Sequence, residues 1–276
     1  MSARVPLAGV IGHPAGHSRS PALHGHWLRS LGLRGHYVPL DVPEDRLADV
    51  LRAMPSMGFV GANVTLPHKT AALALADEAS ERAVRIGAAN TLTFGAAGEI
   101  HADNTDGIGF LAALRAGAPG WRPEGGAALV LGAGGAARAV VDALVEAGAP
   151  RVILANRTRA RADALAAEMG AEAIAWDDAA EAIGSAALVV NSTSLGMSGA
   201  AELTLPLGAL RPGMVVMDLV YAPLRTPLLE AAEAAGATAV DGLGMLLHQA
   251  APGFERWFGA APPVDAAARD AALAAP

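Results

Sequence analysis

The stretch Ala127–Ala137, AALVLGAGGAA, decides the fold of this chain. Its first five residues form a short apolar run typical of a buried strand, and the residues after the glycines read as a helix to Ala147. In the pattern Gly132-x-Gly134-x-x-Ala137, the first glycine permits a tight turn and the second lets the backbone approach a pyrophosphate. The small third residue packs helix on strand. A lone pattern of this kind is weak in a chain with 32 glycines, but its place between strand and helix favours a nucleotide-binding turn over an ordinary one.

Strands and helices continue to alternate downstream of this turn. We expect strands at Arg151–Ala155, Leu188–Asn191, Val215–Leu219 and Thr238–Val240, and helices at Arg159–Met169 and Pro227–Ala235. This order predicts a Rossmann-type, doubly wound domain. The Gly/Pro-rich segment Gly117–Gly126 before it resembles a linker, and the tail Leu243–Ala275 is predicted to be helical apart from Pro252 and Pro262-Pro263.

The first hundred residues predict a second, smaller α/β domain with a mostly parallel sheet. The expected strands are Val5–Ile11, Tyr37–Leu40, Gly61–Leu66 and a hairpin of Asn90–Phe94 with Glu99–Ala102. The expected helices are Pro21–Leu31, Pro43–Met54 and Ala71–Arg85, and a further helix, Asp106–Ala116, is expected before the linker segment. The fold class is therefore α/β, with two open α/β domains.

Composition excludes several classes of function. The 276 residues carry a formal net charge of -7, so a nucleic-acid partner is not expected. The chain has no cysteine, which excludes disulfides, thiolate nucleophiles and cysteine metal sites, and no metal is expected. Mean hydropathy is +0.35, yet no run of 18 apolar residues predicts a membrane span, and Met1–Pro6 lacks a secretory apolar core. We expect a soluble cytoplasmic protein.

Rare residue types mark candidate functional positions. The 20 basic residues are 19 arginines and one lysine, Lys69, and the chain has one glutamine, Gln249. Its five asparagines are Asn63, Asn90, Asn104, Asn156 and Asn191. Since the composition favours Ala, Gly and Arg, a position that keeps lysine or an amide indicates a need for that group.

The segment Asn156–Arg161 indicates which dinucleotide is bound. A carboxylate near this point binds the ribose 2′-hydroxyl in NAD sites, but here the strand end carries an asparagine and arginines. Guanidinium groups clamp a 2′-phosphate, and cations at a helix N-terminus oppose the macrodipole unless an anion joins them. A solvated basic helix start is the alternative. The pattern favours NADP over NAD.

Four polar clusters follow strands of the N-terminal domain, and strand ends at one edge of an open sheet converge on a crevice. They are His17–Pro21, Asn63–Lys69, Gly87–Thr91 and Asn104–Gly107. Together they offer hydroxyls, amides, one amine and one carboxylate, which suit a small polyhydroxylated acid. Each also has a plainer interpretation: Ser18 and Ser20 as helix caps, Asp106 as an N-cap, and Lys69 as a solvated surface lysine.

With these motifs the chain resembles the shikimate dehydrogenase family over nearly its whole length. Further segments carry the resemblance: Gly12-His13-Pro14, the nucleotide turn, Asn156-Arg157-Thr158, Asn191–Met197, Asp218–Tyr221, Asp241–Leu246 and Gln249. The family implies reversible NADPH-dependent reduction of 3-dehydroshikimate to shikimate, in aromatic amino-acid biosynthesis.

The resemblance also implies roles for individual residues. Lys69 and Asp106 would be the catalytic pair, with Asp106 also touching the substrate. The other substrate-binding residues would be Ser18, Ser20, Asn63, Thr65, Asn90, Tyr221 and Gln249. The cofactor would contact Glu81, Gly132, Ala133, Gly134, Gly135, Ala136, Asn156, Arg157, Thr158, Arg159, Arg161, Thr193, Leu219 and Gly242.

The family further implies a substrate domain of residues 1–106, completed by helices 243–276, and an NADP-binding domain of residues 107–242, with the active site in the cleft between them. Lysine fits the chemistry because it stabilises an alkoxide and also gives up a proton, which arginine does not. Gly25 and Ala102-Asp103 depart from the usual family pattern, which puts local loop packing in question.

Two alternatives stay open: a quinate/shikimate dehydrogenase of broader specificity, and a non-catalytic NADP-sensing binding protein. The Ser18-x-Ser20 pair and the missing acid at Asn156 favour the shikimate-specific form. The oligomeric state, a homodimer included, does not follow from the sequence.

Overall fold

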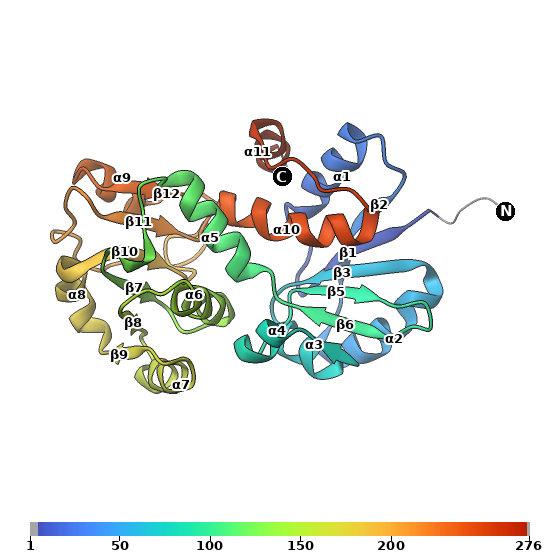
Figure 1. The fold of residues 1–276 in the computed structure, drawn as a ribbon, viewed down its shortest axis with the longest axis horizontal. Coiled ribbons are helices and arrows are strands. Elements are labelled where there is room, and N and C mark those ends of the chain that lie inside the picture. Colours follow the sequence, from blue (N-terminus) through green and yellow to red (C-terminus); the bar gives the residue numbers. More distant parts are fainter. Residues whose placement is uncertain (1–4, 275–276) are drawn as a thin grey trace. The chain divides into compact units, whose positions relative to one another are not determined.

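A computed structural model describes residues 5–274 and divides the chain into two compact units (Figure 1). The first unit runs to Thr105 and resumes at Leu246, and the second is Asp106–Met245. The sequence placed these divisions after residues 106 and 242. Met1–Arg4 of the N-terminal stretch and Ala275 of the expected helical tail lie outside the described residues.

The first unit is built on a six-stranded sheet in the order β2-β1-β3-β5-β6-β4. The strands are β1 (Leu7–Gly12), β2 (His36–Asp41), β3 (Phe59–Val64), β4 (Glu78–Ala79), β5 (Thr91–Phe94) and β6 (Ile100–Asp103). β1 pairs in parallel with β2 and β3, and β4 with β6, whereas β5 is antiparallel to both of its neighbours. The expected hairpin is therefore present, and β3 and β6 point the same way.

Helices cover both faces of this sheet. They are α1 (Ser20–Ser30), α2 (Leu47–Met57), α3 (Lys69–Leu75), α4 (Glu81–Ile86), α10 (Leu243–Phe258) and α11 (Ala266–Leu273), with a 3-10 turn η1 (Glu44–Arg46). Because strand side chains alternate, Ile11 of β1 faces the cluster with Leu51 of α2, while Val10 faces Tyr37 and Trp257.

Two expectations for the first unit are wrong. The single helix expected over Ala71–Arg85 is α3, strand β4 and α4. The new helix starts because the hydroxyl of Ser80 accepts a hydrogen bond from the Ala83 amide, an N-cap within an alanine-rich stretch. Pro252 does not interrupt α10 but lies inside it, since the buried face of this helix, with Phe254 and Trp257, packs along the unit.

The second unit is a six-stranded, fully parallel sheet in the order β12-β11-β10-β7-β8-β9. Its strands are β7 (Ala127–Leu131), β8 (Val152–Ala155), β9 (Glu172–Ile174), β10 (Ala186–Asn191), β11 (Val215–Asp218) and β12 (Thr238–Val240). The first strand lies in the middle, and the strand order reverses between β7 and β10, as in Rossmann folds. The predicted doubly wound fold is confirmed.

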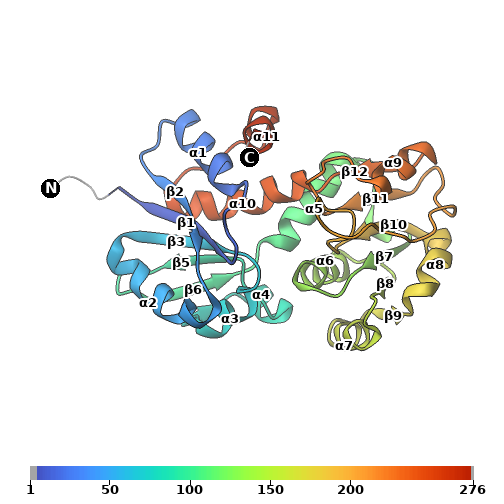
Figure 2. The same ribbon diagram turned by 180° about the vertical axis from the view of Figure 1, so that it is seen from behind.

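The helices of this unit are α5 (Asp106–Gly117), α6 (Gly135–Glu146), α7 (Arg159–Met169), α8 (Ala179–Ser185) and α9 (Pro227–Ala234), with 3-10 turns η2 (Pro123–Gly125) and η3 (Trp176–Asp178). Val130 of β7 packs with α5, α6 and α7, whereas Leu129 packs with α8 and α9. Figure 2 shows the ribbon of this unit from behind. Both faces of the strand are thus buried, which explains its unbroken apolar sequence.

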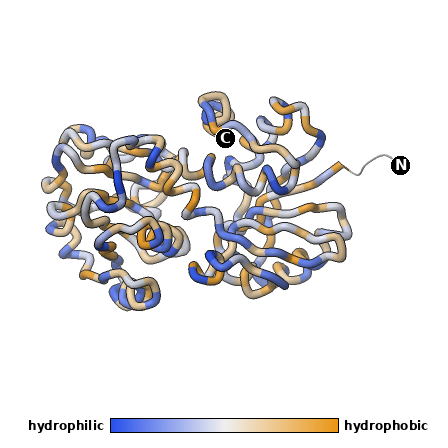
Figure 3. The backbone as a smooth tube through the Cα atoms, in the orientation of Figure 1, coloured by the Kyte–Doolittle hydropathy of each residue, from blue (hydrophilic) through white to orange (hydrophobic). Residues whose placement is uncertain are grey.

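Two segments of this unit differ from expectation. Gly117–Gly126 is not an interdomain linker, because its residues Ala118 and Trp121 are buried in the core that contains Val130. β9 and α8 were not expected, since a strand of three residues and a helix of seven are too short to show a clear periodicity. Figure 3 shows apolar stretches along the chain in both units. No helix within residues 5–274 has the length and hydropathy that a membrane span requires.

Candidate active site

Three of the expected polar clusters meet at one edge of the first unit's sheet, through Asn63–Lys69, Gly87–Thr91 and Asn104-Thr105. β1, β3 and β6 are parallel, so their carboxyl ends lie at the same edge, where the antiparallel β5 begins. Backbone hydrogen bonds link these ends in turn: Thr65 N–H to Ile11 O (2.8 Å), Val64 N–H to Asn90 O (2.8 Å), and Asn90 N–H to Asp103 O (3.0 Å). The topology therefore brings the expected substrate-binding segments side by side.

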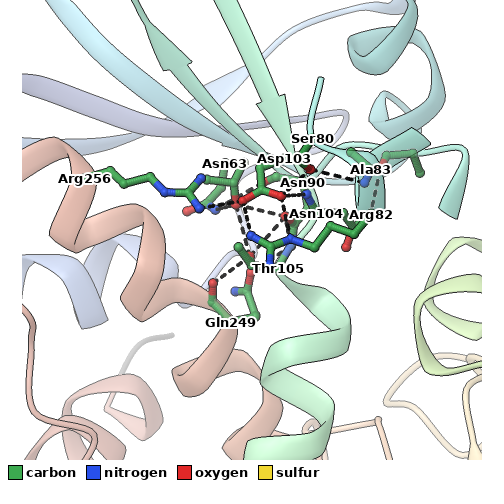
Figure 4. Close-up of polar contacts among 12 residues, drawn as sticks. Asn63, Ser80, Arg82, Ala83, Asn90, Asp103, Asn104, Thr105, Gln249 and Arg256 are labelled. Carbon is green, nitrogen blue, oxygen red and sulfur yellow. Dashed lines mark hydrogen bonds and ion pairs between the residues drawn. The ribbon is translucent and has the colours of Figure 1, made fainter. Parts of the chain in front are cut away.

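Asn90 is the centre of a buried hydrogen-bond network at this edge (Figure 4). Its side-chain oxygen accepts from the Thr105 amide (2.8 Å) and from the Thr91 hydroxyl (2.9 Å). Its side-chain NH2 donates to Oε1 of Gln249 (3.1 Å), and the Gln249 carbonyl accepts from the Thr105 hydroxyl (2.8 Å). Gln249 is thus brought from α10 onto the strand ends, 159 residues away from Asn90 in the chain.

Asn63 is also buried, and its partners fix the orientation of its amide. The Tyr37 hydroxyl donates to Asn63 Oδ1 (2.7 Å), while the Asn63 NH2 donates to Asn90 O (3.1 Å). Burial raises the pKa of Tyr37 well above its ordinary value, although a hydrogen bond with Ser20 acts the other way. The Tyr37 ring stacks on His24 with centroids 3.8 Å apart, so the phenol is held in place on both sides.

The remaining residues of this edge lie where their elements begin. Ser20 and Lys69 are the first residues of α1 and α3, and Lys69 is only partly exposed rather than a fully solvated lysine. The amide of Ala89 donates to the Lys69 carbonyl (2.9 Å), which ties the start of α3 to the segment before Asn90. No side chain caps α1 at its N-cap residue Arg19, but the Ser18 hydroxyl accepts a hydrogen bond from the Ser20 amide (3.3 Å), the first amide of the helix.

Asp103 lies at the end of β6, two residues before Thr105, and its side chain is only 7% exposed. It accepts hydrogen bonds from the Ser80 hydroxyl (2.7 Å), from Arg82 of α4 (2.5 Å at the shortest) and from Arg256 of α10 (2.6 Å). Burial acts to raise the pKa of Asp103, but these three partners outweigh burial and hold the pKa well below its usual range. Asp103 is therefore a carboxylate at neutral pH.

In the second unit, the glycine-rich turn joins β7 to α6 in the way a pyrophosphate requires. Gly132 has a φ of +111°, and a Cβ there would lie 2.7 Å from the Ser192 hydroxyl, so only glycine fits. Gly134 and Gly135 face open space. No side chain caps α6 at Gly134, which leaves the first amides of this helix to an anion.

Two other segments expected at the cofactor lie next to each other in this unit. A Cβ on Gly242 would come within 2.3 Å of the Leu219 carbonyl oxygen, so the backbones after β11 and β12 are in close contact. Asp218, at the end of β11, accepts from Asn191 (2.9 Å), Thr226 (2.7 Å) and the Val220 amide (3.0 Å). Burial raises its pKa, and these bonds oppose that effect.

The hydroxyl of Thr193 is used within its own loop. It donates to Asn191 Oδ1 (2.7 Å) and accepts from the Leu195 amide (3.0 Å). These two bonds shape the turn after β10. The Thr193 amide also donates to Asn191 Oδ1 (3.1 Å), which leaves the Thr193 carbonyl and methyl group for any contact with a cofactor.

The three arginines after β8 differ in their surroundings. Arg159 donates to Asp163 (2.7 Å) and to the Ala173 carbonyl (3.2 Å). The exposed guanidinium groups of Arg157 and Arg161 have no such partner among the described residues. Asn156 donates to the Thr158 carbonyl (2.9 Å) and closes the turn. Arg157 and Arg161 are thus the two that remain available for a 2′-phosphate.

The structure also places the three remaining expected residues within their own units. Glu81 is an exposed residue at the start of α4. Asp106 is buried as the first residue of α5, directly after Thr105, and Tyr221 lies in the loop after β11.

Comparisons with known proteins identify the family. The model of the shikimate dehydrogenase substrate binding domain matches residues 10–92, that of shikimate/quinate 5-dehydrogenase residues 122–198, and that of the shikimate 5′-dehydrogenase C-terminal domain residues 242–269. The NADP(+) shikimate dehydrogenase of Cereibacter sphaeroides is 63% identical over 273 residues, which are 98% of each chain. The chain belongs to the shikimate dehydrogenase family.

Solved structures of the family share this fold. Shikimate 5-dehydrogenase of Thermus thermophilus, in complex with NADP(H) and shikimate, has a TM-score of 0.88 and 43% identity, covering 98% of this chain and 99% of that one. Quinate dehydrogenase of Corynebacterium glutamicum, in complex with NAD, has a TM-score of 0.90 and 34% identity, covering 97% and 98%. The resemblance inferred from the motifs is confirmed.

Sequence reasoning missed three residues that organise the site: Tyr37, Asp103 and Arg256. A signal existed for Tyr37, since the chain has only two tyrosines and the argument from rare residues was not applied to them. Asp103 was noted only as a departure from the family pattern. Arg256 had no signal, because it is one of 19 arginines and its partner lies 153 residues away.

Proposed function

We propose that this chain catalyses the reversible NADPH-dependent reduction of 3-dehydroshikimate to shikimate, as its family does. The observation that carries the proposal is the edge of the first sheet, where three strand ends and Gln249 gather hydroxyls, amides and the chain's only lysine around buried Asn90. A ring with three oxygen substituents and a carboxylate needs such a set of short polar side chains.

The substrate-binding residues we propose are those of the sheet edge, together with two residues of the second unit. Ser18 and Ser20 would bind the carboxylate, because a serine hydroxyl donates to a carboxylate while its oxygen accepts from another group, as that of Ser18 does from the Ser20 amide. Asn90 and Gln249 would bind ring hydroxyls, and their mutual hydrogen bond fixes which amide atoms face the substrate. The full proposed set is Ser18, Ser20, Asn63, Thr65, Asn90, Asp106, Tyr221 and Gln249.

Lys69 and Asp106 are the proposed catalytic pair. Bound NADPH would supply the hydride. Addition of a hydride to the ketone carbon leaves an alkoxide, and the Lys69 ammonium stabilises this charge and donates the proton. The carboxylate of Asp106 would accept a hydrogen bond from a substrate hydroxyl and favour the charged form of the lysine. In the reverse direction the neutral amine accepts the proton of the hydroxyl.

NADP is the proposed cofactor because the second unit fits its charged groups. The uncapped start of α6 and the open space over Gly134 and Gly135 suit the pyrophosphate. Arg157 and Arg161 suit the 2′-phosphate, and Arg159 supports the turn through Asp163. Glu81 and the backbone of Thr193 stay in the proposal as peripheral contacts.

The decisive test is the rate of NADPH formation at 340 nm with shikimate and NADP. We expect turnover on shikimate with NADP, and a kcat/KM at least a hundredfold lower for quinate or for NAD. Equal rates on shikimate and quinate would favour the broader quinate/shikimate dehydrogenase. Tight NADP binding without turnover would favour a non-catalytic NADP-sensing protein.

We also propose that the first unit binds the substrate and the second binds NADP, with the domain boundaries after residues 106 and 242. A cytoplasmic location fits a reductive biosynthetic step that draws on NADPH and a chain without cysteine. The oligomeric state, monomer or homodimer, is to be measured by sedimentation.

A further inference from the structure

The carboxylate of Asp103 joins three elements of the first unit. It ends β6, and it receives Arg82 from α4 and Arg256 from α10, which approach it from its two sides (Figure 4). It also accepts from the Asn104 amide (2.8 Å), the first residue of the segment that leads to Thr105. None of the catalytic or binding roles proposed above uses Asp103, Arg82 or Arg256.

We propose that Arg256 is a positioning residue, which holds α10 against the end of β6 through Asp103 and thereby places Gln249 for substrate binding. This inference rests on the proposed function for its kinetic readout. Gln249 itself touches the substrate in that proposal, and Arg256 acts only through it.

Helix geometry supports the connection. Gln249 and Arg256 are seven residues apart on α10, about two turns, so they lie on the same face of the helix. Gln249 contacts Thr105 and Asn90, while Arg256 contacts Asp103, two residues before Thr105. α10 is therefore held at the end of β6 at two points, while Trp257, next to Arg256, donates to the Leu92 carbonyl of β5 (3.0 Å). Losing Arg256 removes the contact of α10 with Asp103 and leaves Gln249 as its remaining contact with this strand end.

Asp103 does not require Arg256 for the neutralisation of its charge. Arg82 already binds both carboxylate oxygens, through Nε (2.7 Å) and Nη2 (2.5 Å). Removing one partner of a buried pair is severe when it leaves an uncompensated charge. Without Arg256, Asp103 still has Arg82 and Ser80, so the variant keeps a paired carboxylate and is expected to fold.

The test compares Arg256→Met with two matched variants. Arg52→Met removes another arginine of the same unit, which binds Asp77 through both oxygens (2.7 and 3.0 Å) away from the site. Arg82→Met removes the other guanidinium from Asp103. Arg256→Lys is added as the conservative variant. For wild type and each variant we measure the steady-state kinetics with shikimate and NADP and the amide hydrogen exchange of α10.

For Arg256→Met we expect the KM for shikimate to rise about tenfold, the effect of weakening one hydrogen bond to the substrate. We expect kcat to change less than threefold and the KM for NADP less than twofold. Exchange of the amides around Gln249 should be about tenfold faster. Arg256→Lys should have a KM for shikimate and an exchange rate between those of wild type and Arg256→Met. Arg52→Met should match wild type in both quantities. Arg82→Met should change the KM for shikimate less than threefold.

A KM for shikimate within twofold of wild type in Arg256→Met overturns the inference, whatever its melting temperature. An equal rise in Arg82→Met also overturns it, because the charge of Asp103 rather than the place of α10 would then matter. Failure of the proposed function is distinguishable: wild type would not oxidise shikimate, yet the exchange difference between Arg256→Met and Arg52→Met would still report on α10.

Discussion

His24 makes the stability of the first unit depend on pH. Its side chain is fully buried between Tyr37, Trp27, Phe254 and Trp257, and neither ring nitrogen has a hydrogen-bond partner among the described residues. Desolvation lowers its pKa from 6.5 to about 3. The folded protein therefore keeps this imidazole neutral at a pH where the unfolded chain protonates it.

The sign and size of the effect follow from linkage. Because the folded pKa is lower than the unfolded one, the contribution to stability is complete above pH 6.5 and is lost as the pH falls towards 3. Each unit of pH in this window costs about 1.4 kcal/mol, so wild type should lose roughly 3 kcal/mol from His24 between pH 7.5 and 4.5.

The variant His24→Phe removes this titration and both unpaired nitrogens while keeping an aromatic ring. Urea unfolding at pH 7.5 and 4.5 measures the free energy of both proteins, and carboxylates common to both cancel in the difference. We expect wild type to lose about 3 kcal/mol more than the variant. His24→Leu repeats the comparison in case the larger ring fits poorly. Equal losses in wild type and both variants, or an imidazole NMR titration of His24 near 6.5, would refute this reasoning.

Three further predictions concern the proposed chemistry. Lys69→Arg should lower kcat by roughly 10²–10⁴ with little change in the dissociation constant for shikimate, because arginine keeps the charge but gives no proton; a near wild-type kcat would rule Lys69 out as the donor. Arg157→Ala should weaken NADP binding by about 1.5–3 kcal/mol and leave NAD unchanged, as measured by calorimetry, whereas Arg159→Ala should affect NADP far less. Gly242→Ala should weaken NADP binding and lower the melting temperature, since its Cβ would lie 2.3 Å from the Leu219 carbonyl oxygen; unchanged values for both would contradict that close approach.

The elements that sequence predicted well are those whose signals are local. β7 matches its expected range because its run of apolar residues ends at Gly132, and α7 matches because it begins after the turn at Asn156 and ends at Gly170, its left-handed C-cap. The single helix expected over Ala71–Arg85 is wrong because its interruption depends on two hydrogen bonds of Ser80. The Ser80 hydroxyl caps α4, and it also donates to Asp103, 23 residues later. The helix propensities of residues 71–85 carry no information about this distant partner.

The candidate site shows the same difference between residues with a local signal and residues that depend on a distant partner. Lys69, Asn90 and Gln249 stood out because their types are rare in this chain. Asn63 was expected near the substrate, but its amide orientation depends on Tyr37, which no spacing along the sequence connects to it. Arg159 was grouped with its neighbours because the sequence does not show that Asp163 and the Ala173 carbonyl already engage it.

The ribosome synthesises α10 long after the sheet that this helix covers, and this order affects folding during synthesis. Tyr37 leaves the ribosome about 220 residues before Trp257, the side chain that covers its cluster with Val10. At roughly 5–20 residues per second, that apolar surface waits on the order of 10–40 s for its cover. During this time the nascent sheet exposes an aromatic face of the kind that chaperones bind. A protein cut short after Met245 would keep that face uncovered for its lifetime.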